Sequence, residues 1–293
     1  MMEQRKENIV MFPFMAQGHI IPFLALAIEL EQKRGRTITF ASTPLNIKRI
    51  KPSLPPNSSI QLLEIPFRSS DHGLPPDCEN THDLPYHLIL KLVEASRSLK
   101  PSFHELVYDL VRKQHGRLPL CIISDSFFGW CADIAHELGV FHAIFFPFCA
   151  FSTACYYSIG MSLPHRNNES KEFVLADFHV RASRIHVTQM SENLQGGQSW
   201  CRDSKEIEEI GVCVQVARGR ISEVKSEDIV AKIDLVMNDS EKGKEMRKRA
   251  CEVRNIINNS IDDKEEFKGA SVKAMDDFLN AAMLMREQAK TTP

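Results

Sequence analysis

The sequence lacks the common signatures that would assign it directly to a function class. Its 36 Lys and Arg against 38 Asp and Glu give a net charge of −2, so no positive excess is present to bind nucleic acid or an anionic membrane. No GxGxxG, GxxxxGK[ST], GxSxG or HExxH string occurs, which argues against nicotinamide, P-loop, serine-hydrolase and zincin chemistry. The composition is also too balanced for collagen, a coiled coil or wholesale disorder.

Disulfide, metal and membrane signals are equally weak. The eight cysteines include no CxxC pair, so the sequence predicts reduced thiols, no metal and a cytoplasmic location. The apolar run at residues 9–16 is too short for a signal peptide. The uncharged stretch from Val140 to Leu163 is long enough for a membrane span, but His142 and Pro147 favour a buried strand followed by a buried helix. We therefore expect no membrane span.

The composition changes abruptly near Gln195. Charged residues make up 38 of the first 195 positions and 36 of the remaining 98. All 11 histidines and 14 of the 15 prolines lie before residue 190. The sequence therefore predicts two regions, residues 1–195 and residues 196–293.

Apolar runs alternate with helical patterns in the first region. The apolar runs predict strands at residues 9–14, 37–41, 60–65, 120–124 and 140–146. Helical periodicity predicts a helix that begins near residues 20–22, a helix over residues 88–111 that breaks near Pro101, and helices at residues 129–138 and 151–162. Such alternation is typical of a parallel sheet covered on both faces, so we predict a Rossmann-like α/β fold.

The second region predicts one strand, residues 211–217, and three amphipathic helices. Ser226 is a candidate cap for the first helix, a second helix follows Ser240, and the third spans residues 271–288. The stripes expected to be buried are Ile229, Ile233, Val236 and Met237, then Met246, Ala250, Val253 and Ile257, then Met275, Phe278, Leu279 and Ala282. A single strand has no ladder partner, so this region is expected to be the end of a domain that docks on other structure.

Two ionisable residues follow predicted strands where parallel sheets bind ligands. His19 comes after the first strand and Asp125 ends the fourth. A carboxylate within hydrogen-bond reach would orient the imidazole, which could then remove a proton from a hydroxyl acceptor. The alternative is purely structural, with His19 as a helix cap and Asp125 as a turn residue.

Aromatic runs offer walls for an apolar pocket near this pair. Residues 127–130 and 145–151 are rich in phenylalanine and could line an acceptor site, although such runs also form ordinary core. The acceptor-binding candidates are Phe14, Gln17, Gly18, Phe127 and Phe148. The segment at residues 71–79, with adjacent prolines, predicts a loop and a possible rim of the pocket.

Several segments together resemble the plant family-1 UDP-glycosyltransferases. They are FPFMAQGHIIP at residues 12–22, ITFAST at 38–43, LPPDCENT at 74–81, IISDSFFGW at 122–130, SRIHVTQMSEN at 183–193, residues 211–219, and FKGASVKAMDDFLNAA at 267–282. The chain is similar to the UGT92A type of this family.

The resemblance implies a specific fold and reaction. It implies a GT-B pair of Rossmann-like domains, with the acceptor site in residues 1–195 and a remnant of the nucleotide-sugar domain in residues 196–293. It implies sugar transfer from a UDP-sugar co-substrate to a small hydroxylated plant metabolite such as a flavonoid, phenolic or terpenoid. His19 matches the family's general base and Asp125 the aspartate that orients it. No metal or other cofactor is implied.

The chain departs from the family pattern at the donor site. The HCGWNS-type turn and the acidic-Gln pair of the family's donor box are not found, and the sequence passes near residues 196–201 from the end of one domain to the end of the other. This departure makes UDP-sugar binding by this chain doubtful. The alternative function is therefore a truncated, inactive remnant that acts as a small-molecule- or partner-binding module.

Overall fold

The computed structural model describes residues 6–148, 150–163, 172–174, 184–186, 225–264 and 267–291. The chain divides into two compact units, one of residues 1–147 together with 276–293, and one of residues 148–275. The predicted boundary between residues 195 and 196 lies outside the described residues and stays a prediction.

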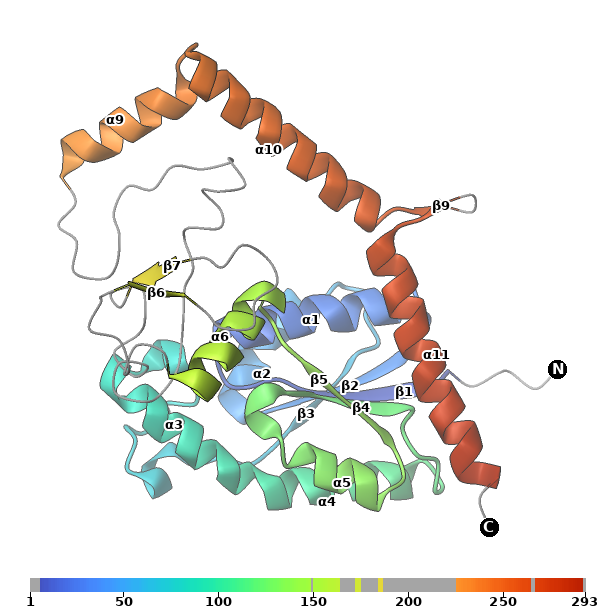
Figure 1. The fold of residues 1–293 in the computed structure, drawn as a ribbon. Coiled ribbons are helices and arrows are strands. Elements are labelled where there is room, and N and C mark those ends of the chain that lie inside the picture. The colour runs from blue at the N-terminus through green and yellow to red at the C-terminus, as the bar shows by residue number, and fades with distance from the viewer. Residues whose placement is uncertain are drawn as a thin grey trace. The chain divides into compact units, whose positions relative to one another are not determined.

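A parallel five-stranded sheet forms the centre of the first unit (Figure 1). Its strand order is β3–β2–β1–β4–β5, and every neighbouring pair is parallel. The strands are β1 (Asn8–Phe12), β2 (Thr37–Ser42), β3 (Gln61–Glu64), β4 (Cys121–Asp125) and β5 (Phe141–Phe145). The predicted α/β class and the five predicted strands are confirmed. The strand order reverses between β1 and β4, which makes this pair the topological switch point of the sheet.

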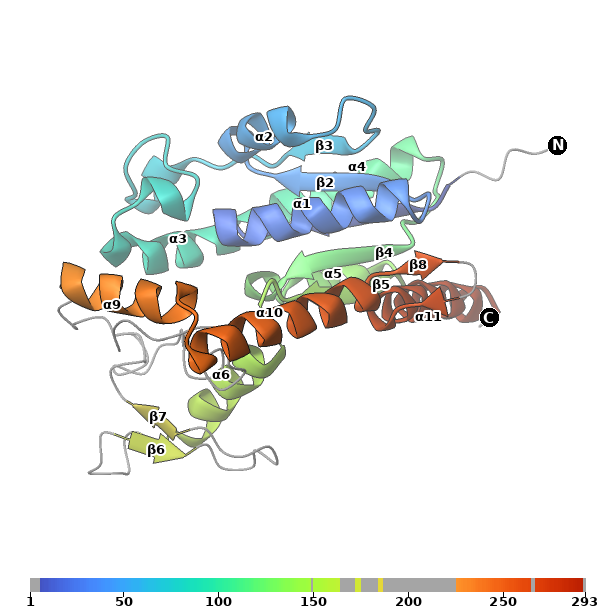
Figure 2. The ribbon, with the colours of Figure 1, turned by 90° about the horizontal axis from the view of Figure 1, so that it is seen from above.

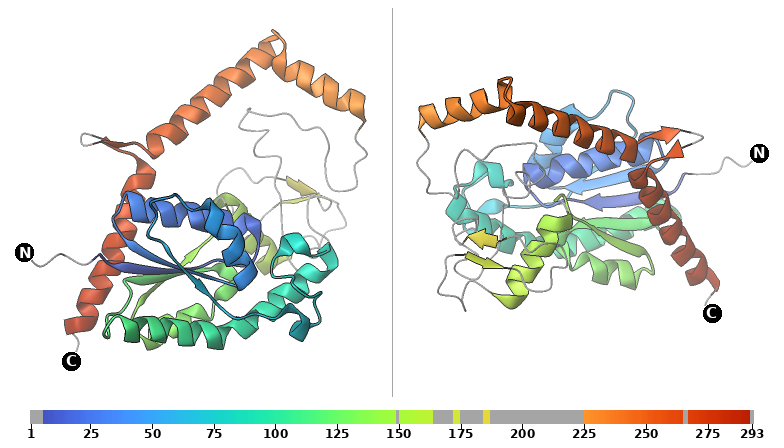
Figure 3. Two further views of the ribbon diagram at one scale, coloured as in Figure 1. Left: turned by 180° about the vertical axis from the view of Figure 1, so that it is seen from behind. Right: turned by 45° about the horizontal axis from the view of Figure 1, so that its top comes forward.

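Helices cover both faces of this sheet (Figure 1; Figure 3, left). They are α1 (Gln17–Gln32), α2 (Pro44–Ile50), α3 (Ile89–Ala95), α4 (Leu99–Lys113) and α5 (Cys131–Glu137). In the views, α1 lies on one face and α4 and α5 lie on the other. Side chains alternate along β1, so Val10 and Phe12 share the face that forms the main core, and Ile9 and Met11 point the opposite way.

Phe12 is the centre of the core beneath the carboxyl ends of the strands. Its ring stacks on Phe103 of α4 at 4.6 Å between centroids and on Phe128 at 4.3 Å. All three rings are fully buried. Offset stacking of buried rings adds to the free energy gained from burying their apolar area.

Two helix boundaries differ from those predicted. Helix α1 begins at Gln17, so Pro22 lies inside the helix and not in its first turn, and His19 is the third helical residue and not part of a loop. Ala16 has an extended backbone and marks the start of the helix, about one turn earlier than the start predicted from Pro22. The predicted break near Pro101 falls instead at residues 96–98, which form a 3₁₀ turn, because proline is tolerated in the first turn of α4.

The C-terminal helix α11 (Ala270–Thr291) contributes its residues from Asp276 onward to the first unit. Leu279 and Ala282 are buried, as predicted, and Phe278 packs edge-on against Phe141 of β5. Arg286 pairs with Glu7 at the start of β1. Helix α11 is therefore attached to this unit by apolar packing and by an ion pair.

The second unit is mainly helical in its described part (Figure 2). Its elements are α6 (Ala150–Ser162), β6 (Glu172–Val174), β7 (Arg184–His186), α9 (Ser226–Met237), α10 (Glu241–Ser260), β8 (Asp263–Lys264), β9 (Phe267–Lys268) and the first turns of α11. The strand and helix predicted between Val140 and Leu163 are confirmed as β5 and α6. The predicted strand at residues 211–217 lies outside the described residues.

The buried stripes predicted for α9 and α10 are largely wrong. Ile229, Ile233 and Met237 of α9 are 42%, 55% and 70% exposed, and Ile257 of α10 is 56% exposed, whereas Met246 is buried as predicted. The main described neighbour of α9 is α10, so its apolar face meets too little surface to be buried. Ser226 is not the cap either, because Lys225 precedes the first helical residue, whereas Ser240 does cap α10 through the N–H of Gly243.

None of the described helices combines the length and the apolar character needed to cross a bilayer.

The Phe12 core predicts a large loss of stability on truncation. Phe12→Ala removes a fully buried ring with two stacking partners and should cost about 3–5 kcal/mol in the free energy of unfolding. Urea denaturation measures this change. The matched control is Ile21→Ala, whose side chain is 61% exposed and whose loss should change stability by less than about 0.5 kcal/mol. Equal losses in the two variants would contradict the assignment of Phe12 to the core.

The ion pairs of Glu7 predict a pH-dependent contribution to stability. Burial alone would raise the pKa of Glu7, but hydrogen bonds and charges from Arg286 and Arg117 outweigh burial and hold the pKa below its ordinary 4.5. The contribution is therefore present above pH 4.5 and is lost as the pH falls through the folded-state pKa. The melting temperature of wild type should exceed that of Glu7→Gln at neutral pH, and the gap should close toward about pH 3. A gap that is constant across this range would remove the electrostatic explanation.

Candidate active site

His19 lies in the first turn of α1, directly beyond the carboxyl end of β1. Its side chain is 8% exposed, so the imidazole is largely shielded from water. Helix α1 has neither a side-chain cap nor an acidic residue in its first turn. The first turn of α1 therefore contributes no acidic side chain of its own to the surroundings of His19.

Asp125 meets His19 from the end of β4. Asp125 Oδ2 lies 2.7 Å from His19 Nδ1, and the carboxylate is fully buried. The other oxygen, Oδ1, accepts the backbone N–H of Phe127 at 3.1 Å. Because an ionised carboxylate only accepts hydrogen bonds, the ring proton of His19 sits on Nδ1 and the lone pair on Nε2. This is the proton arrangement that a general base requires.

Two phenylalanine rings flank the imidazole. Phe14 lies edge-on to the ring of His19 at 5.6 Å, and Phe127 lies at 5.6 Å on a tilted plane. Phe14 and Phe127 also contact each other, with centroids 4.6 Å apart. The structure therefore brings together His19, Asp125, Phe14 and Phe127 from the predicted set. Phe128 and Trp130, from the same aromatic run, pack in the core against Phe12.

A second histidine, His142 of β5, contacts the residue that precedes Asp125. His142 Nε2 hydrogen-bonds with the buried Ser124 Oγ at 2.9 Å. Burial lowers the pKa of His142, so its ring stays neutral over more of the pH range. It therefore adds no positive charge near Asp125 at neutral pH.

Two of the remaining acceptor-binding candidates, Gln17 and Gly18, directly precede His19 at the start of α1. Gly18 is exposed, and Gln17 lines a cavity of about 150 Å³ between α1 and α2, together with Ile21, Asn46 and Arg49. Ligand pockets usually measure roughly 300–1,000 Å³, so this cavity is too small for a flavonoid-sized molecule. Phe148 is 40% exposed and belongs to the second unit. Acceptor binding by Gln17, Gly18 and Phe148 stays a prediction.

The described residues offer no set of side chains that could bind a metal ion. No group of three or more His, Cys, Asp or Glu side chains there is placed to hold a metal ion. Of the described cysteines, Cys121 and Cys131 are buried, and burial raises the pKa of the Cys121 thiol to about 12. Such a thiol is not a nucleophile at neutral pH.

Sequence reasoning predicted a loop at residues 71–79 as a rim of the pocket, but it missed the contact between this loop region and the segment before α1. The backbone N–H of Thr81 donates to the carbonyl of Met15, just before α1, at 3.0 Å. The adjacent prolines at residues 75–76 predicted the loop, but they did not indicate its hydrogen bond to Met15. The segment LPPDCENT, which includes Thr81, was also among the segments that resemble the family.

Comparison with known proteins identifies the family. A model described as "Glycosyltransferase, N-terminal domain" matches residues 6–204, more than half of the chain. UDP-glycosyltransferase 92A1 of Arabidopsis thaliana is 43% identical over 212 residues, which cover 69% of this chain and 43% of that protein. The chain belongs to the plant family-1 UDP-glycosyltransferases. The resemblance stated from sequence is thereby confirmed.

A second curated relative agrees with the family assignment. Crocetin glucosyltransferase 3 of Crocus sativus is 42% identical over 200 residues, or 67% of this chain and 42% of that protein. Among solved structures, Arabidopsis thaliana UGT89C1 matches 53% of this chain and 38% of its own at 25% identity, with a TM-score of 0.47. The chain spans less than half the length of these curated relatives where it matches them.

The geometry of the pair predicts a spectroscopic signature. In Asp125→Asn, the amide can present an N–H to His19 Nδ1, which favours the proton on Nε2 instead. The ¹⁵N signals of the His19 ring should therefore exchange their protonated and unprotonated characters relative to wild type. Asp133→Asn, at an exposed carboxylate paired with Lys100, is the matched control and should leave those signals unchanged. Unaltered His19 signals in Asp125→Asn would contradict the assigned proton position.

Proposed function

We propose that this chain provides the acceptor side of a glycosyl transfer from a UDP-sugar to a small hydroxylated metabolite, with His19 as the general base. The observation that carries this proposal is the 2.7 Å contact between His19 Nδ1 and Asp125 Oδ2, beside Phe14 and Phe127. Membership of the UDP-glycosyltransferase family supports the reaction class.

The proposed reaction uses few protein groups. His19 Nε2 accepts the proton of the acceptor hydroxyl as its oxygen attacks the anomeric carbon of the sugar. The bond from that carbon to the diphosphate breaks, UDP leaves with the electron pair, and the anomeric configuration inverts. Asp125 stabilises the imidazolium that forms, because its buried carboxylate holds the ring on the opposite nitrogen. No metal takes part.

The acceptor is proposed to be apolar and aromatic or terpenoid. The rings of Phe14 and Phe127 offer an apolar surface beside the base, which suits a flat or bulky hydrocarbon skeleton that carries a hydroxyl group. The names of relatives point the same way, since one is a crocetin glucosyltransferase and another, from Fragaria ananassa, a flavonoid 3-O-glucosyltransferase.

The absence of a disulfide among the four described cysteines is compatible with the proposed cytoplasmic location.

A second candidate function is acceptor binding without transfer. It is favoured by one sequence observation, that no HCGWNS-type string is found in this chain. The two functions differ in donor binding, because a base accelerates transfer only when the donor is held in position to react. Calorimetric titration of the full chain with UDP-glucose separates them. Saturable binding supports transfer, and acceptor binding without donor binding supports the binding module.

The role of His19 predicts a large loss of transfer rate on substitution. With UDP-glucose and a flavonoid acceptor, His19→Gln should reduce the rate by about 10²–10⁴-fold, because the acceptor hydroxyl loses its base. Product formation followed by chromatography measures the change. His104→Gln, at an exposed histidine of α4, is the matched control and should retain the wild-type rate. A His19→Gln protein with full transfer rate would refute the proposed base.

A further inference from the structure

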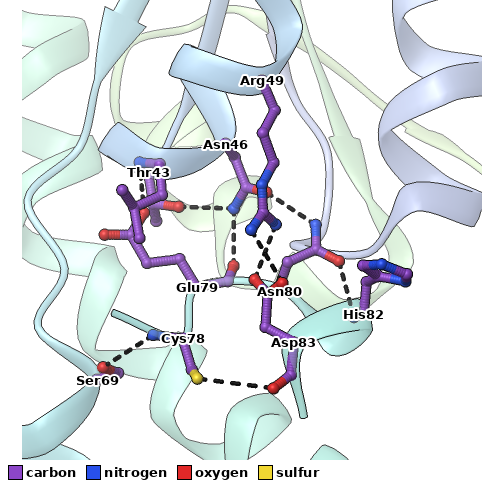
Figure 4. Close-up of polar contacts among 10 residues, drawn as sticks. Thr43, Asn46, Arg49, Ser69, Cys78, Glu79, Asn80, His82 and Asp83 are labelled. Atoms are coloured by element: carbon purple, nitrogen blue, oxygen red, sulfur yellow. Dashed lines mark hydrogen bonds and ion pairs between the residues drawn. The ribbon is translucent and has the colours of Figure 1, made fainter. Parts of the chain in front are cut away.

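A buried polar cluster joins the loop at residues 74–84 to the start of α2 (Figure 4). We call Thr43, Asn46, Glu79 and Asn80 the Asn46–Asn80 cluster. Thr43, Asn46 and Asn80 are fully buried, and Glu79 is 6% exposed. Burying so many polar side chains is costly unless each finds a partner, so the arrangement is specific.

The two asparagine amides satisfy each other and the backbone around them. Asn46 Nδ2 donates to Thr43 Oγ1 at 2.8 Å and to the Glu79 carbonyl at 2.7 Å, while Asn46 Oδ1 accepts from Asn80 Nδ2 at 2.8 Å. Asn80 Oδ1 accepts the N–H of His82 at 3.0 Å. Figure 4 shows the Asn80 amide lying between Asn46 and His82. Asn80 is thus used at both ends, as donor and as acceptor.

The amide orientation of Asn46 is fixed by these partners. If the Asn46 amide were reversed, its oxygen would face the Glu79 carbonyl, and two acceptors would meet at 2.7 Å. The Asn46 oxygen must therefore point at residue 80, and residue 80 must supply a donor. A serine at position 80 could still cap the turn at His82, but its side chain is too short to reach Asn46.

The residue after Asn80 forms a backbone hydrogen bond with the segment that leads into α1. Thr81 follows Asn80, and its N–H donates to the carbonyl of Met15 at 3.0 Å. Met15 precedes Ala16, the residue before α1, and the turn of α1 that follows carries His19. Because Ala16 provides no side-chain cap, the start of α1 depends on the position of this preceding segment.

We propose that Asn80 is a positioning residue that sets the imidazole of His19 against Asp125. Asp125 is fixed by its place in β4, so the distance between the pair depends on where the Met15–His19 turn lies. Asn80 holds Thr81 in place through Asn46, and Thr81 holds Met15. For catalysis the inference rests on the proposed role of His19, whereas the effect on ring geometry does not.

Asn80→Ser is the variant that tests the proposal, measured in the full chain by the ¹⁵N signals of the His19 ring. The serine keeps the cap at His82 and removes only the bond to Asn46. We expect the His19 signals to move away from the wild-type pattern toward a mixture of proton positions. The rate of transfer from UDP-glucose should fall by about 10²-fold, the size expected for a misplaced catalytic group.

Asp83→Asn is the matched control. Asp83 ties the same loop to α2 through a two-pronged pair with Arg49 at 2.8 and 2.9 Å, in a more exposed position (Figure 4). We expect it to lower the melting temperature while leaving the His19 signals in place. If both variants shift the His19 signals equally, or if Asn80→Ser shifts neither signals nor rate, the positioning role is overturned.

Two further arms keep the outcomes separate. Asn80→Ala repeats the test with the cap at His82 also removed and should shift the His19 signals at least as far as Asn80→Ser. Should His19→Gln retain transfer activity, the proposed function fails while the His19 signals still decide the positioning role. Should His19→Gln lose activity while Asn80→Ser keeps both rate and signals, only the positioning role fails.

Discussion

Parallel pairing between β1 and β4 places His19 beside Asp125, although 106 residues of sequence separate them. The register aligns Phe12 with Ser124, so both strands end at the same level of the sheet. After β1 the chain continues to β2 on one side of the pair, and after β4 it continues to β5 on the other side. The loops that follow β1 and β4 therefore run in opposite directions, which leaves room for a ligand above the ends of these two strands. The hydrogen-bond geometry of the site is thus a consequence of strand order.

The two members of the pair are held by different means. Asp125 is the last residue of a fully buried strand, and its carboxylate also caps the short turn that begins at Ser126. His19 lies on a helix whose start has no cap of its own and which contains a proline. The position of Asp125 is therefore fixed by the sheet. The position of His19 depends instead on the packing of Phe14 and Met15 and on the loop that hydrogen-bonds to Met15.

The strands and the His19–Asp125 pair could be predicted because their signals are local or topological. The run CIISD is apolar and ends in a carboxylate, and the parallel class then places its end at the same edge as the residues after β1. The predicted start of α1 was too late because proline usually lies in the first turn of a helix, whereas Pro22 lies inside α1. The stripe of α9 was predicted buried because periodicity reports which side chains share a face, but it does not report whether another surface covers that face.

The Asn46–Asn80 cluster was invisible to sequence reasoning for a related physical reason. Asparagines in loops usually pair with nearby backbone or with water, so their type does not reveal a long-range partner. Asn46 and Asn80 meet only because α2 and the loop after β3 pack side by side, and burial then turns ordinary polar side chains into groups that must be satisfied. A buried amide pair tolerates few alternative arrangements, because each one leaves a donor or an acceptor unmatched. This makes the loop a precise support for an adjacent helix start, which apolar packing alone would fix less sharply.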